Sequence, residues 1–369
     1  MALIWLLIAC MIAMTLQGWL LGRRSLSKLG YTRRFSTEAC HAGERIEMVE
    51  TIANLKVLPV PWLRLEALLP ASLTFARSRE TAISKGSIYQ NHASLFTLPP
   101  KTRITRTYQV ECEGRGIYRI ESVTMTGSDL FGVYTPARQI PLNQRLVVYP
   151  RLLEEEELPL SWRTWQGELA VRRWIVEDPF QWSGIREYAP GDPLNRIHWK
   201  ASARSGGLQV RRNGHSADPR AMICLNIEES EAMWSVVTEP GRLEAALSCA
   251  ATVAARLIHQ GMAAGYAHNA CVSEAAGRPE GRVAPGHGLP HLVLLLEAMA
   301  GTDLKAREPF YEFLAREAAE EEREPLDYLL VTAHVSNRIA DAIRSLEERG
   351  HRVAVVGEPL WGGGARDER

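Results

Sequence analysis

The sequence has no excess charge of either sign, because 43 Lys and Arg residues balance 43 Asp and Glu residues. A balanced net charge gives no global electrostatic argument for nucleic-acid binding, and no nucleic-acid partner is expected. The sequence also lacks a GxxxxGK[ST] phosphate loop, a GxSxG nucleophile elbow and an HExxH zinc motif. These absences remove the motif support for a phosphate-loop nucleotidase, a serine hydrolase of that type and a zinc protease.

Cysteine is scarce and scattered. The six cysteines contain no CxxC pair: Cys10, Cys40, Cys112, Cys224, Cys249 and Cys271. A disulfide framework or a structural zinc site needs closely and regularly spaced cysteines. Two of the six stand in apolar surroundings, within residues 221–227 and 245–255. The spacing therefore predicts reduced core residues, and neither a disulfide framework nor a zinc site.

A long uncharged run does occur at the N-terminus, over Ala2–Leu21. Twenty helical residues span about 30 Å, the thickness of a bilayer core. This run predicts a transmembrane helix over residues 1–22. Cations follow it and none precedes it: Arg23, Arg24, Lys28, Arg33 and Arg34. With the positive-inside rule, we expect a single-pass protein of the cell membrane, a basic juxtamembrane segment over 23–34, and the bulk of the chain in the cytoplasm.

Residues 35–150 alternate apolar and polar residues in short runs that are separated by Pro and Gly. This pattern predicts an all-β domain, an antiparallel sandwich of roughly Ig-like size. A linker and connecting segment is expected over 151–184, with four glutamates at Glu154–Glu157 forming a solvated turn.

The period of the pattern changes in the C-terminal half. Ala221–Ile227 is a continuous apolar run, typical of a strand that is buried on both faces. A strong helix ends at Gly261, and a later one fits between Ser336 as N-cap and Gly350 as stop signal. Alternating strands and helices predict a doubly wound α/β domain over 216–360, with a flexible tail over 361–369.

Residues 185–215 join the two predicted domains and contain the stretch REYAPGDPLNRIHWKASAR. Ala189–Asp192 suits a type II turn, and Asp192 would cap a short helix that begins at Pro193. Leu194 and Ile197 would lie on one helix face, with Trp199 as a buried anchor. The opposite face would carry a row of cations. These cations either pair with acids of the β-domain, as a clasp, or bind an external partner, and both interpretations stay open.

This stretch resembles the signature of the family known as domain of unknown function 58, with the pattern RxYxPGDxxxxIxWKxSAR. Two further segments, Gly114–Tyr134 and Leu146–Pro150, are similar to the family's RGxY…DxFG pattern and to the strand that closes its β-domain. The resemblance implies an N-terminal membrane segment, a β-sandwich and a von Willebrand factor A-like α/β domain. It also implies a MoxR-type AAA+ ATPase as protein partner, since the two commonly occur together.

A von Willebrand A-type domain often binds Mg²⁺ at an Asp-x-Ser-x-Ser motif after its first strand. Here the corresponding segment is Asn226–Ser230, in which Asn replaces the Asp and Glu replaces the first Ser. Mg²⁺ prefers hard oxygen ligands in near-octahedral geometry, and a long Glu would crowd the site. The sequence favours no metal and no other cofactor, and it leaves four degenerate candidates: Asn226, Glu228, Ser230 and Thr332.

The combined interpretation is a membrane-tethered, non-enzymatic scaffold or adaptor of the cytoplasmic face. Its partner surface would comprise the carboxyl edge of the α/β sheet, near Asn226–Ser230 and Thr332, together with the signature residues. Those residues are Arg186, Tyr188, Pro190, Gly191, Asp192, Arg196, Trp199, Lys200, Ser202 and Arg204. The alternatives are a Mg²⁺-dependent adhesion-type module and an enzyme of the cell envelope.

Overall fold

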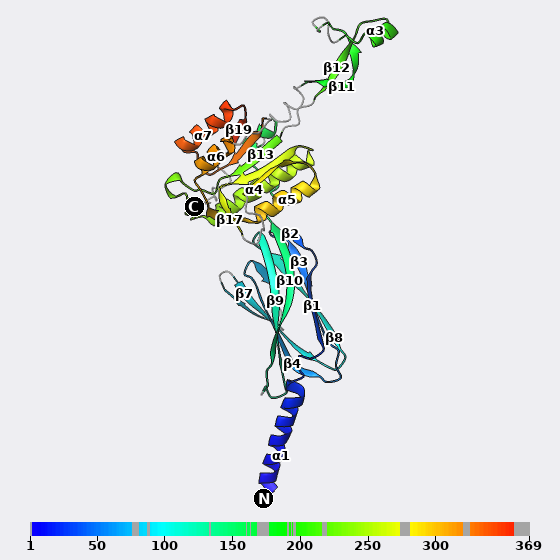
Figure 1. Ribbon diagram of the computed structural model, residues 1–369, viewed down its shortest axis with the longest axis vertical. Helices are drawn as coiled ribbons and strands as arrows, with labels where there is room; N and C mark the ends of the chain where they lie inside the picture. Colours follow the sequence, from blue (N-terminus) through cyan, green and yellow to red (C-terminus); the bar gives the residue numbers. More distant parts are fainter. Residues whose placement is uncertain are drawn as a thin grey trace, which may run out of the picture. The chain divides into compact units, whose positions relative to one another are not determined.

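The computed structural model describes most of the chain (Figure 1). The described residues are 2–75, 81–86, 89–132, 134–159, 161–162, 164–167, 177–189, 192, 194, 197–215, 220–273, 281–319 and 325–357. They form two compact units, one built mainly from residues up to Arg151 and the other mainly from residues after it. We call them the β unit and the α/β unit and describe each separately.

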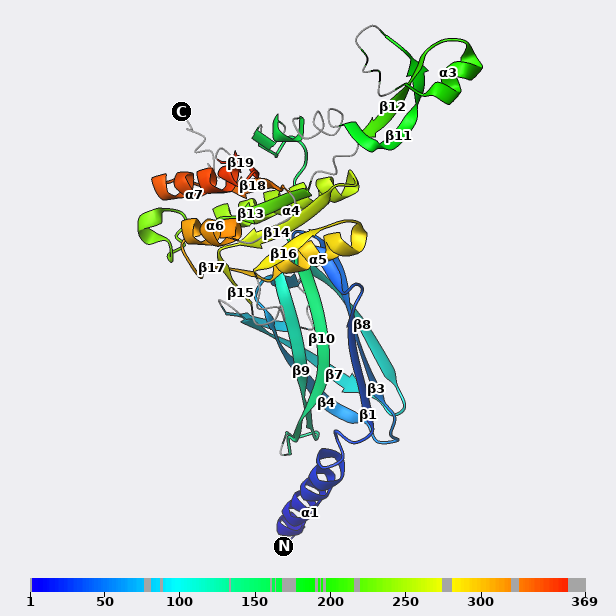
Figure 2. The same ribbon diagram turned by 45° about the horizontal axis from the view of Figure 1, so that its top comes forward.

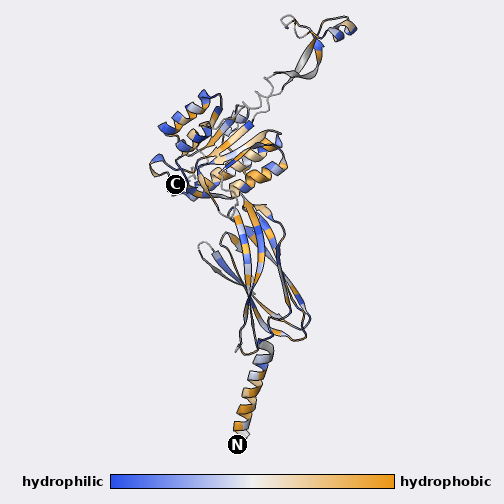
Figure 3. Ribbon diagram, viewed as in Figure 1, coloured by the Kyte–Doolittle hydropathy of each residue, from blue (hydrophilic) through white to orange (hydrophobic). Residues whose placement is uncertain are grey.

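The chain begins with helix α1 (Ala2–Gln17), which is followed by a π-helical turn, η1 (Gly18–Gly22). Figure 3 shows α1 as a largely hydrophobic helix. Its 16 residues span about 24 Å at 1.5 Å per residue, which is shorter than a hydrocarbon core of about 30 Å. No helix in the described parts of the chain has both the length and the apolar character required to cross a membrane.

The predicted transmembrane helix over residues 1–22 is therefore wrong. The single-pass membrane localisation with a cytoplasmic bulk, which was derived from it, falls with it. The physical reason is that the regular α-helix ends at Gln17, before it is long enough to span a bilayer core. Gln17 Nε2 donates a 2.8 Å hydrogen bond to Asp129 Oδ2 of the β unit, and the backbone leaves α-helical geometry at Gly18.

The β unit consists of two sheets. A four-stranded sheet has the order β1 (Leu29–Phe35), β3 (Arg45–Asn54), β8 (Arg103–Cys112), β5 (Leu73–Phe75). A six-stranded sheet has the order β2 (Ala39–His41), β10 (Ala137–Tyr149), β9 (Gly116–Ser128), β4 (Val60–Pro70), β7 (Tyr89–Leu98), β6 (Thr81–Lys85). Neighbouring strands are antiparallel, except that β2 pairs with β10 in parallel.

The two sheets pack against each other through the buried side chains that alternate along their strands. In β3, residues from Ile46 to Asn54 alternate buried with less buried positions, as expected for a strand that covers a core on one face. Met48 and Ile52 of the four-stranded sheet share a core with Leu65 and Val123 of the six-stranded sheet. The β unit is therefore a two-sheet sandwich with one apolar interior.

The α/β unit is built around a five-stranded sheet (Figure 2). Its order is β16 (Arg282–Gly286), β14 (Ala263–His268), β13 (Arg220–Leu225), β18 (Asp327–Val331), β19 (Arg352–Val356). All neighbouring pairs are parallel except β14–β16. The helices are α4 (Pro240–His259), α5 (Leu289–Ala300), α6 (Phe310–Ala319) and α7 (Asn337–Glu348). A separate two-stranded ribbon joins β15 (Ala270–Val272) to β17 (Thr302–Ala306).

The order of strands creates a switch point. From β13 the chain passes through α4 to β14 on one side, whereas β18 joins the sheet on the other side of β13. In open α/β sheets, loops diverge at the carboxyl ends of such strands and leave room for a ligand or a partner. The loops that follow β13 and β18 are therefore the place at which to look for a functional site.

Candidate functional site at the carboxyl edge of the parallel sheet

Two of the predicted residues meet at the switch point. Asn226 follows β13, Thr332 follows β18, and both are buried. The Asn226 Nδ2 atom donates a 2.9 Å hydrogen bond to Thr332 Oγ1, and Asn226 N donates to the carbonyl of Val331. Thr332 Oγ1 in turn donates to the carbonyl of His334 at 2.7 Å. The loops after β13 and β18 are thus tied by side chains as well as by the sheet.

Asn269, which follows β14, joins a third loop to these two. Its Oδ1 atom accepts a hydrogen bond from Ile227 N at 3.0 Å, and its Nδ2 atom donates to Asn226 Oδ1 at 3.3 Å. The same amide nitrogen reaches the carbonyl of Glu308, ahead of α6. Asn269 was not predicted as a site residue from the sequence. Its position directly after a buried strand is the signal that could have predicted it.

Glu228 is the carboxyl group at the centre of this network, with only 1% of its surface exposed. Its Oε1 atom accepts hydrogen bonds from Phe310 N, at the start of α6, and from Asn269 Nδ2. Its Oε2 atom lies 3.9 Å from His334 Nε2. Burial raises the pKa of Glu228 to about 7 and lowers the pKa of His334. Burial therefore favours the neutral forms of both groups over an ion pair.

Glu229 and Ser230 face other partners. Hydrogen bonds from Thr238 and Glu239 hold the Glu229 carboxylate and, against the effect of partial burial, lower its pKa. Ser230 precedes a 3₁₀ turn, η3 (Glu231–Met233), and its side chain makes no capping hydrogen bond there. The structure thus brings Asn226, Glu228 and Thr332 together and leaves Ser230 apart.

The von Willebrand A-like resemblance implies Mg²⁺ at this edge, and the residues do not fit that ion. Asn226 is neutral and its Oδ1 atom already accepts hydrogen bonds from Glu228 N and from Asn269. Glu228 Oε1 is likewise turned toward donors. Within the described chain, no three His, Cys, Asp or Glu residues cluster where they could hold a metal ion. The polar side chains at the carboxyl edge of the sheet form a hydrogen-bonded network that links the loops after β13, β14 and β18.

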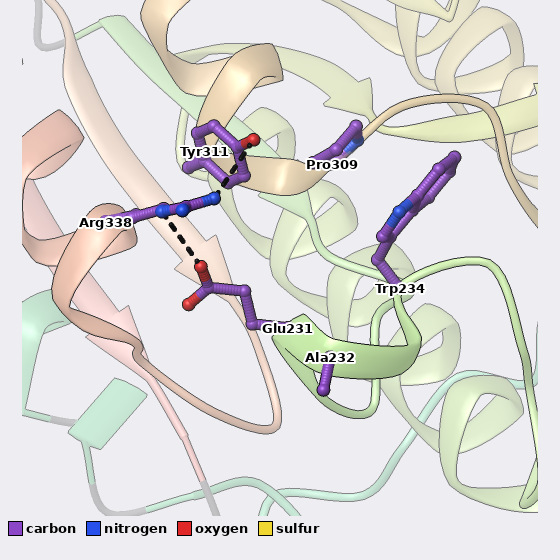
Figure 4. Close-up of a pocket in the computed structure, with 6 residues that line it drawn as sticks. All are labelled: Glu231, Ala232, Trp234, Pro309, Tyr311 and Arg338. Atoms are coloured by element: carbon purple, nitrogen blue, oxygen red, sulfur yellow. Dashed lines mark hydrogen bonds and ion pairs between the residues drawn. The ribbon is translucent and has the colours of Figure 1, made fainter.

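An open pocket of about 510 Å³ lies beside this network and is lined by Glu231, Ala232, Trp234, Pro309, Tyr311 and Arg338. Figure 4 shows Arg338 reaching from α7 toward Glu231 and Tyr311, with Trp234 on the far side of Pro309. Arg338 Nε is 3.3 Å from Glu231 Oε1, and its guanidinium lies 5.2 Å from the centre of the Tyr311 ring. The pocket therefore combines aromatic surface with a charged pair.

Exposed apolar side chains stand on the same loops as the pocket. Met233 ends η3, Val236 follows it, Val335 precedes α7, and each exposes about half of its surface. Trp, Tyr and Arg are the residues most enriched at the energetic centres of protein interfaces. The sequence reading named neither Trp234 nor Arg338, because nothing in the local pattern shows that the loop after β13 meets the N-terminus of α7.

The signature segment is partly as predicted, since Asp192 N donates a 3.0 Å hydrogen bond to the carbonyl of Ala189, as in a turn, and a short helix ends at Gly206. The segment forms an antiparallel hairpin of β11 (Glu177–Glu187) and β12 (Gln209–His215), with helix α3 (Trp199–Ser205) between them. The helix predicted to begin at Pro193 starts outside the described residues, since Pro193 is not among them. The Asp192 carboxylate accepts hydrogen bonds from both terminal nitrogens of Arg186, at 2.6 and 2.7 Å, and from Ala189 N. The N-cap of α3 is His198, whose Nδ1 atom accepts from Ala201 N at 3.1 Å.

Trp199 is 69% exposed, so its prediction as a buried anchor is wrong; Ile197 and Val210 are buried among the described residues of this segment. Ser202 Oγ accepts a 2.8 Å hydrogen bond from Gln209 N and so fastens α3 to β12. Tyr188 is half-buried, and Lys200 and Arg204 are exposed. Pro190, Gly191 and Arg196 lie outside the described residues. The role of this segment as a clasp or a partner surface stays a prediction.

The Arg186–Asp192 pair gives a test of how the signature turn is held. Asp192→Asn removes the charge that accepts two hydrogen bonds from Arg186, and we expect the segment after it to open more often. Limited proteolysis of the full chain should then cut at Lys200 and Arg204 about fivefold faster. Asp341→Asn is the control, because Asp341 pairs with Arg344 on the exposed surface of α7. Equal cleavage rates in the two variants would contradict the assigned role of Asp192.

Comparison with known proteins finds a family whose model matches part of the chain and a distantly similar protein. The model of the family described as "Protein of unknown function DUF58" matches residues 184–357, which include the signature stretch from Arg186 to Arg204 and the carboxyl-edge site. The chain is also similar to the uncharacterized protein YeaD of Bacillus subtilis (strain 168). The two are 21% identical over 353 residues, which cover 95% of this chain and 81% of that protein.

Similar solved structures cover about a third of the chain. One is native alpha-2-macroglobulin of Escherichia coli from domain MG7 to the C-terminus, with TM-score 0.25, 13% identity, and coverage of 33% of this chain and 23% of that chain. Another is a non-cellulosomal cohesin of Archaeoglobus fulgidus, with TM-score 0.23, 11% identity, and coverage of 34% and 94%. Likeness at this level supports no inference about function.

Proposed function

We propose that this protein is a non-enzymatic scaffold or adaptor whose α/β unit docks a protein partner at the carboxyl edge of its parallel sheet. We further infer that this unit is von Willebrand factor A-like and that the partner is a MoxR-type AAA+ ATPase. The observation that supports docking most directly is the open pocket beside the buried network, lined by Trp234, Tyr311 and Arg338.

The composition of the pocket favours a protein ligand. Aromatic side chains bury a large area for little loss of conformational freedom, and Arg adds a directional charge at the rim. Arg338 is 64% exposed at its side chain while it contacts both Glu231 and Tyr311, so its position is set before any partner arrives. A preorganised side chain loses less entropy on binding.

The buried network supports the same proposal in a different way. Asn226, Asn269 and Thr332 use their polar atoms on one another and on the backbone. Their effect is to hold the loops after β13, β14 and β18 in one arrangement, together with the start of α6 through Glu228. A binding surface on loops is precise only when such a shell supports it. Within the described residues, we find no observation that favours the Mg²⁺-dependent module or the cell-envelope enzyme.

Binding between the purified full chain and a MoxR-type AAA+ ATPase tests the proposal. We expect Trp234→Ala and Arg338→Glu each to weaken the interaction about tenfold or more, measured by biolayer interferometry. Arg344→Glu is the matched control, since Arg344 lies on the same helix, is 70% exposed at its side chain and lines no part of the pocket. Absence of binding by the wild type, or equal weakening by all three variants, would refute docking at this edge.

A further inference from the structure

Two buried thiols meet in the interior of the β unit, although they are 72 residues apart in the sequence. The Cys40 and Cys112 Sγ atoms lie 3.5 Å apart, and both residues are almost fully buried. Cys40 belongs to β2 of the six-stranded sheet, and Cys112 ends β8 of the four-stranded sheet. A covalent bond between them would join the two sheets of the sandwich.

Backbone hydrogen bonds bring the two cysteines together when β2 is in place. Gly43 N donates a 2.7 Å hydrogen bond to the carbonyl of Cys112, and Cys112 N donates a 3.0 Å bond to the carbonyl of Glu44. The next residue after β2, Ala42, donates to the carbonyl of Tyr149. Since a disulfide bond is about 2.05 Å long, the sulfur atoms need to approach by about 1.5 Å, which small side-chain rotations provide.

We propose that Cys40 and Cys112 are a redox-active pair that forms a reversible disulfide with a small-molecule disulfide as oxidant. The Cys40 thiolate attacks one sulfur of that molecule, RSSR, and releases RS⁻ as a mixed disulfide forms. The Cys112 sulfur then attacks Cys40, breaks the mixed disulfide and releases the second RS⁻. The two thiol protons pass to the two RS⁻ groups, so the products are one internal disulfide and two RSH.

Cys40 is suited to be the attacking residue. The hydrogen bond with Cys112 lowers the pKa of Cys40 although burial opposes this, whereas the same hydrogen bond and burial raise the pKa of Cys112. The more acidic thiol supplies the thiolate that exchange requires. Burial instead raises the pKa of Cys224 and Cys249, so these two thiols are poor competitors.

An oxidant can reach Cys40 when its strand opens. β2 has only three residues and stands at the edge of its sheet, where it pairs with β10 alone. Short edge strands with few ladder hydrogen bonds open at low cost compared with central strands. Local opening of β2 therefore exposes Cys40 without unfolding the sandwich, and reclosing brings the mixed disulfide back to Cys112.

The test equilibrates the purified full chain with glutathione disulfide and glutathione at a series of ratios, followed by alkylation and non-reducing tryptic mass mapping. Trypsin releases Cys40 in peptide 35–45 and Cys112 in peptide 107–115. We expect these two peptides as one cross-linked species, with a mass loss of about 2 Da that dithiothreitol reverses. The oxidised chain should also show a β-unit unfolding midpoint that is higher by about 5–10 °C.

Cys40→Ser and Cys112→Ser should each abolish the cross-linked peptide and the rise in midpoint, while Cys249→Ser should retain both. Cys112→Ser should in addition accumulate glutathione on Cys40, because the resolving thiol is gone. The proposal is overturned if glutathione disulfide modifies Cys10 or Cys271 while peptides 35–45 and 107–115 stay unlinked at every ratio. It is equally overturned if the link forms only in denaturant.

Discussion

Glu50→Gln is expected to destabilise the β unit by about 3–5 kcal/mol, because it leaves a buried guanidinium without its counter-charge. Arg33 Nη2 lies 2.9 Å from Glu50 Oε1, and both side chains are completely inaccessible to solvent. The other two guanidinium nitrogens of Arg33, Nε and Nη1, find no hydrogen-bond partner among the described residues. The charge of Arg33 is therefore compensated chiefly by this one carboxylate.

The surroundings of Glu50 fix its charge state. Burial alone would raise the pKa of Glu50, but Arg33 and a 2.7 Å hydrogen bond from Tyr31 OH outweigh burial and lower it. His92 is fully buried nearby, and burial lowers its pKa to about 4, so it is neutral at pH 7. Because the folded pKa of Glu50 is depressed, its contribution is complete above about pH 4.5 and is lost as pH falls through the folded value.

A double-variant cycle separates the pair from its surroundings. Arg33→Met should also destabilise, whereas Arg33→Met with Glu50→Leu should recover most of the loss, since two apolar side chains leave no buried charge. Hydrogen exchange of peptides from β1 and β3 in the full chain measures the free energy of opening of this unit. Glu66→Gln is the control, because the Arg64–Glu66 pair is partly exposed and should be worth less than about 1 kcal/mol. Additive losses in the cycle would contradict the assignment.

Arg33 also shows what local sequence patterns can and cannot predict. Its place in a cationic run after an apolar segment gave a juxtamembrane interpretation, yet it lies within β1 and is buried against a strand 17 residues further on. Alternation correctly predicted a strand at β3, since side-chain period is a local property. The pairing between strands determines which charged residue is buried in a sandwich. A local sequence pattern contains no information about that pairing.

The N-terminal helix and the signature segment also combine features that a local pattern predicts with features that depend on distant residues. The hydropathy of Ala2–Leu21 was read correctly as apolar, but the end of the regular helix depends on Asp129, more than a hundred residues away. In the signature, Asp192 was a reasonable helix cap by residue type. In the structure the carboxylate of Asp192 accepts hydrogen bonds from Arg186. The N-cap of the later helix α3 is His198.

The carboxyl-edge site was partly predictable for a topological reason. Parallel neighbours end at the same edge, so Asn226 and Thr332 had to lie close once β13 and β18 were adjacent. His334 and Arg338 were not predictable in this way, because their positions follow from the path of the loop between β18 and α7. The protonation state of Glu228, through which the site affects stability, is set chiefly by burial.

Glu228→Gln is expected to stabilise the protein at alkaline pH. Burial raises the folded pKa of Glu228 to about 7, above the value near 4.5 of an exposed glutamate. The unfolded chain therefore releases this proton at lower pH than the folded chain does. Stability is greatest below about pH 4.5, falls as pH rises toward 7 and then levels off, with a total loss of about 3 kcal/mol.

Glutamine cannot ionise, so the variant should not show this loss. Its carbonyl can still accept from Phe310 N, so the start of α6 keeps this contact. The difference between variant and wild type, measured by urea unfolding, should be small at pH 4.5 and reach about 3 kcal/mol at pH 8. Glu229→Gln is the matched control. Hydrogen bonds from Thr238 and Glu239 lower the pKa of Glu229, so removing its charge should destabilise at pH 8.

The opposite signs expected at adjacent positions make the result informative. If Glu228→Gln lowers stability equally at both pH values, Glu228 acts as an ordinary hydrogen-bond acceptor and its raised pKa is refuted. If it stabilises only at high pH, the chain retains, at the edge proposed for docking, a carboxyl group that lowers stability when it is ionised. Natural sequences keep a destabilising group mainly where function requires it. Stabilisation at high pH alone would therefore be a reason to measure partner binding by Glu228→Gln across the same pH range.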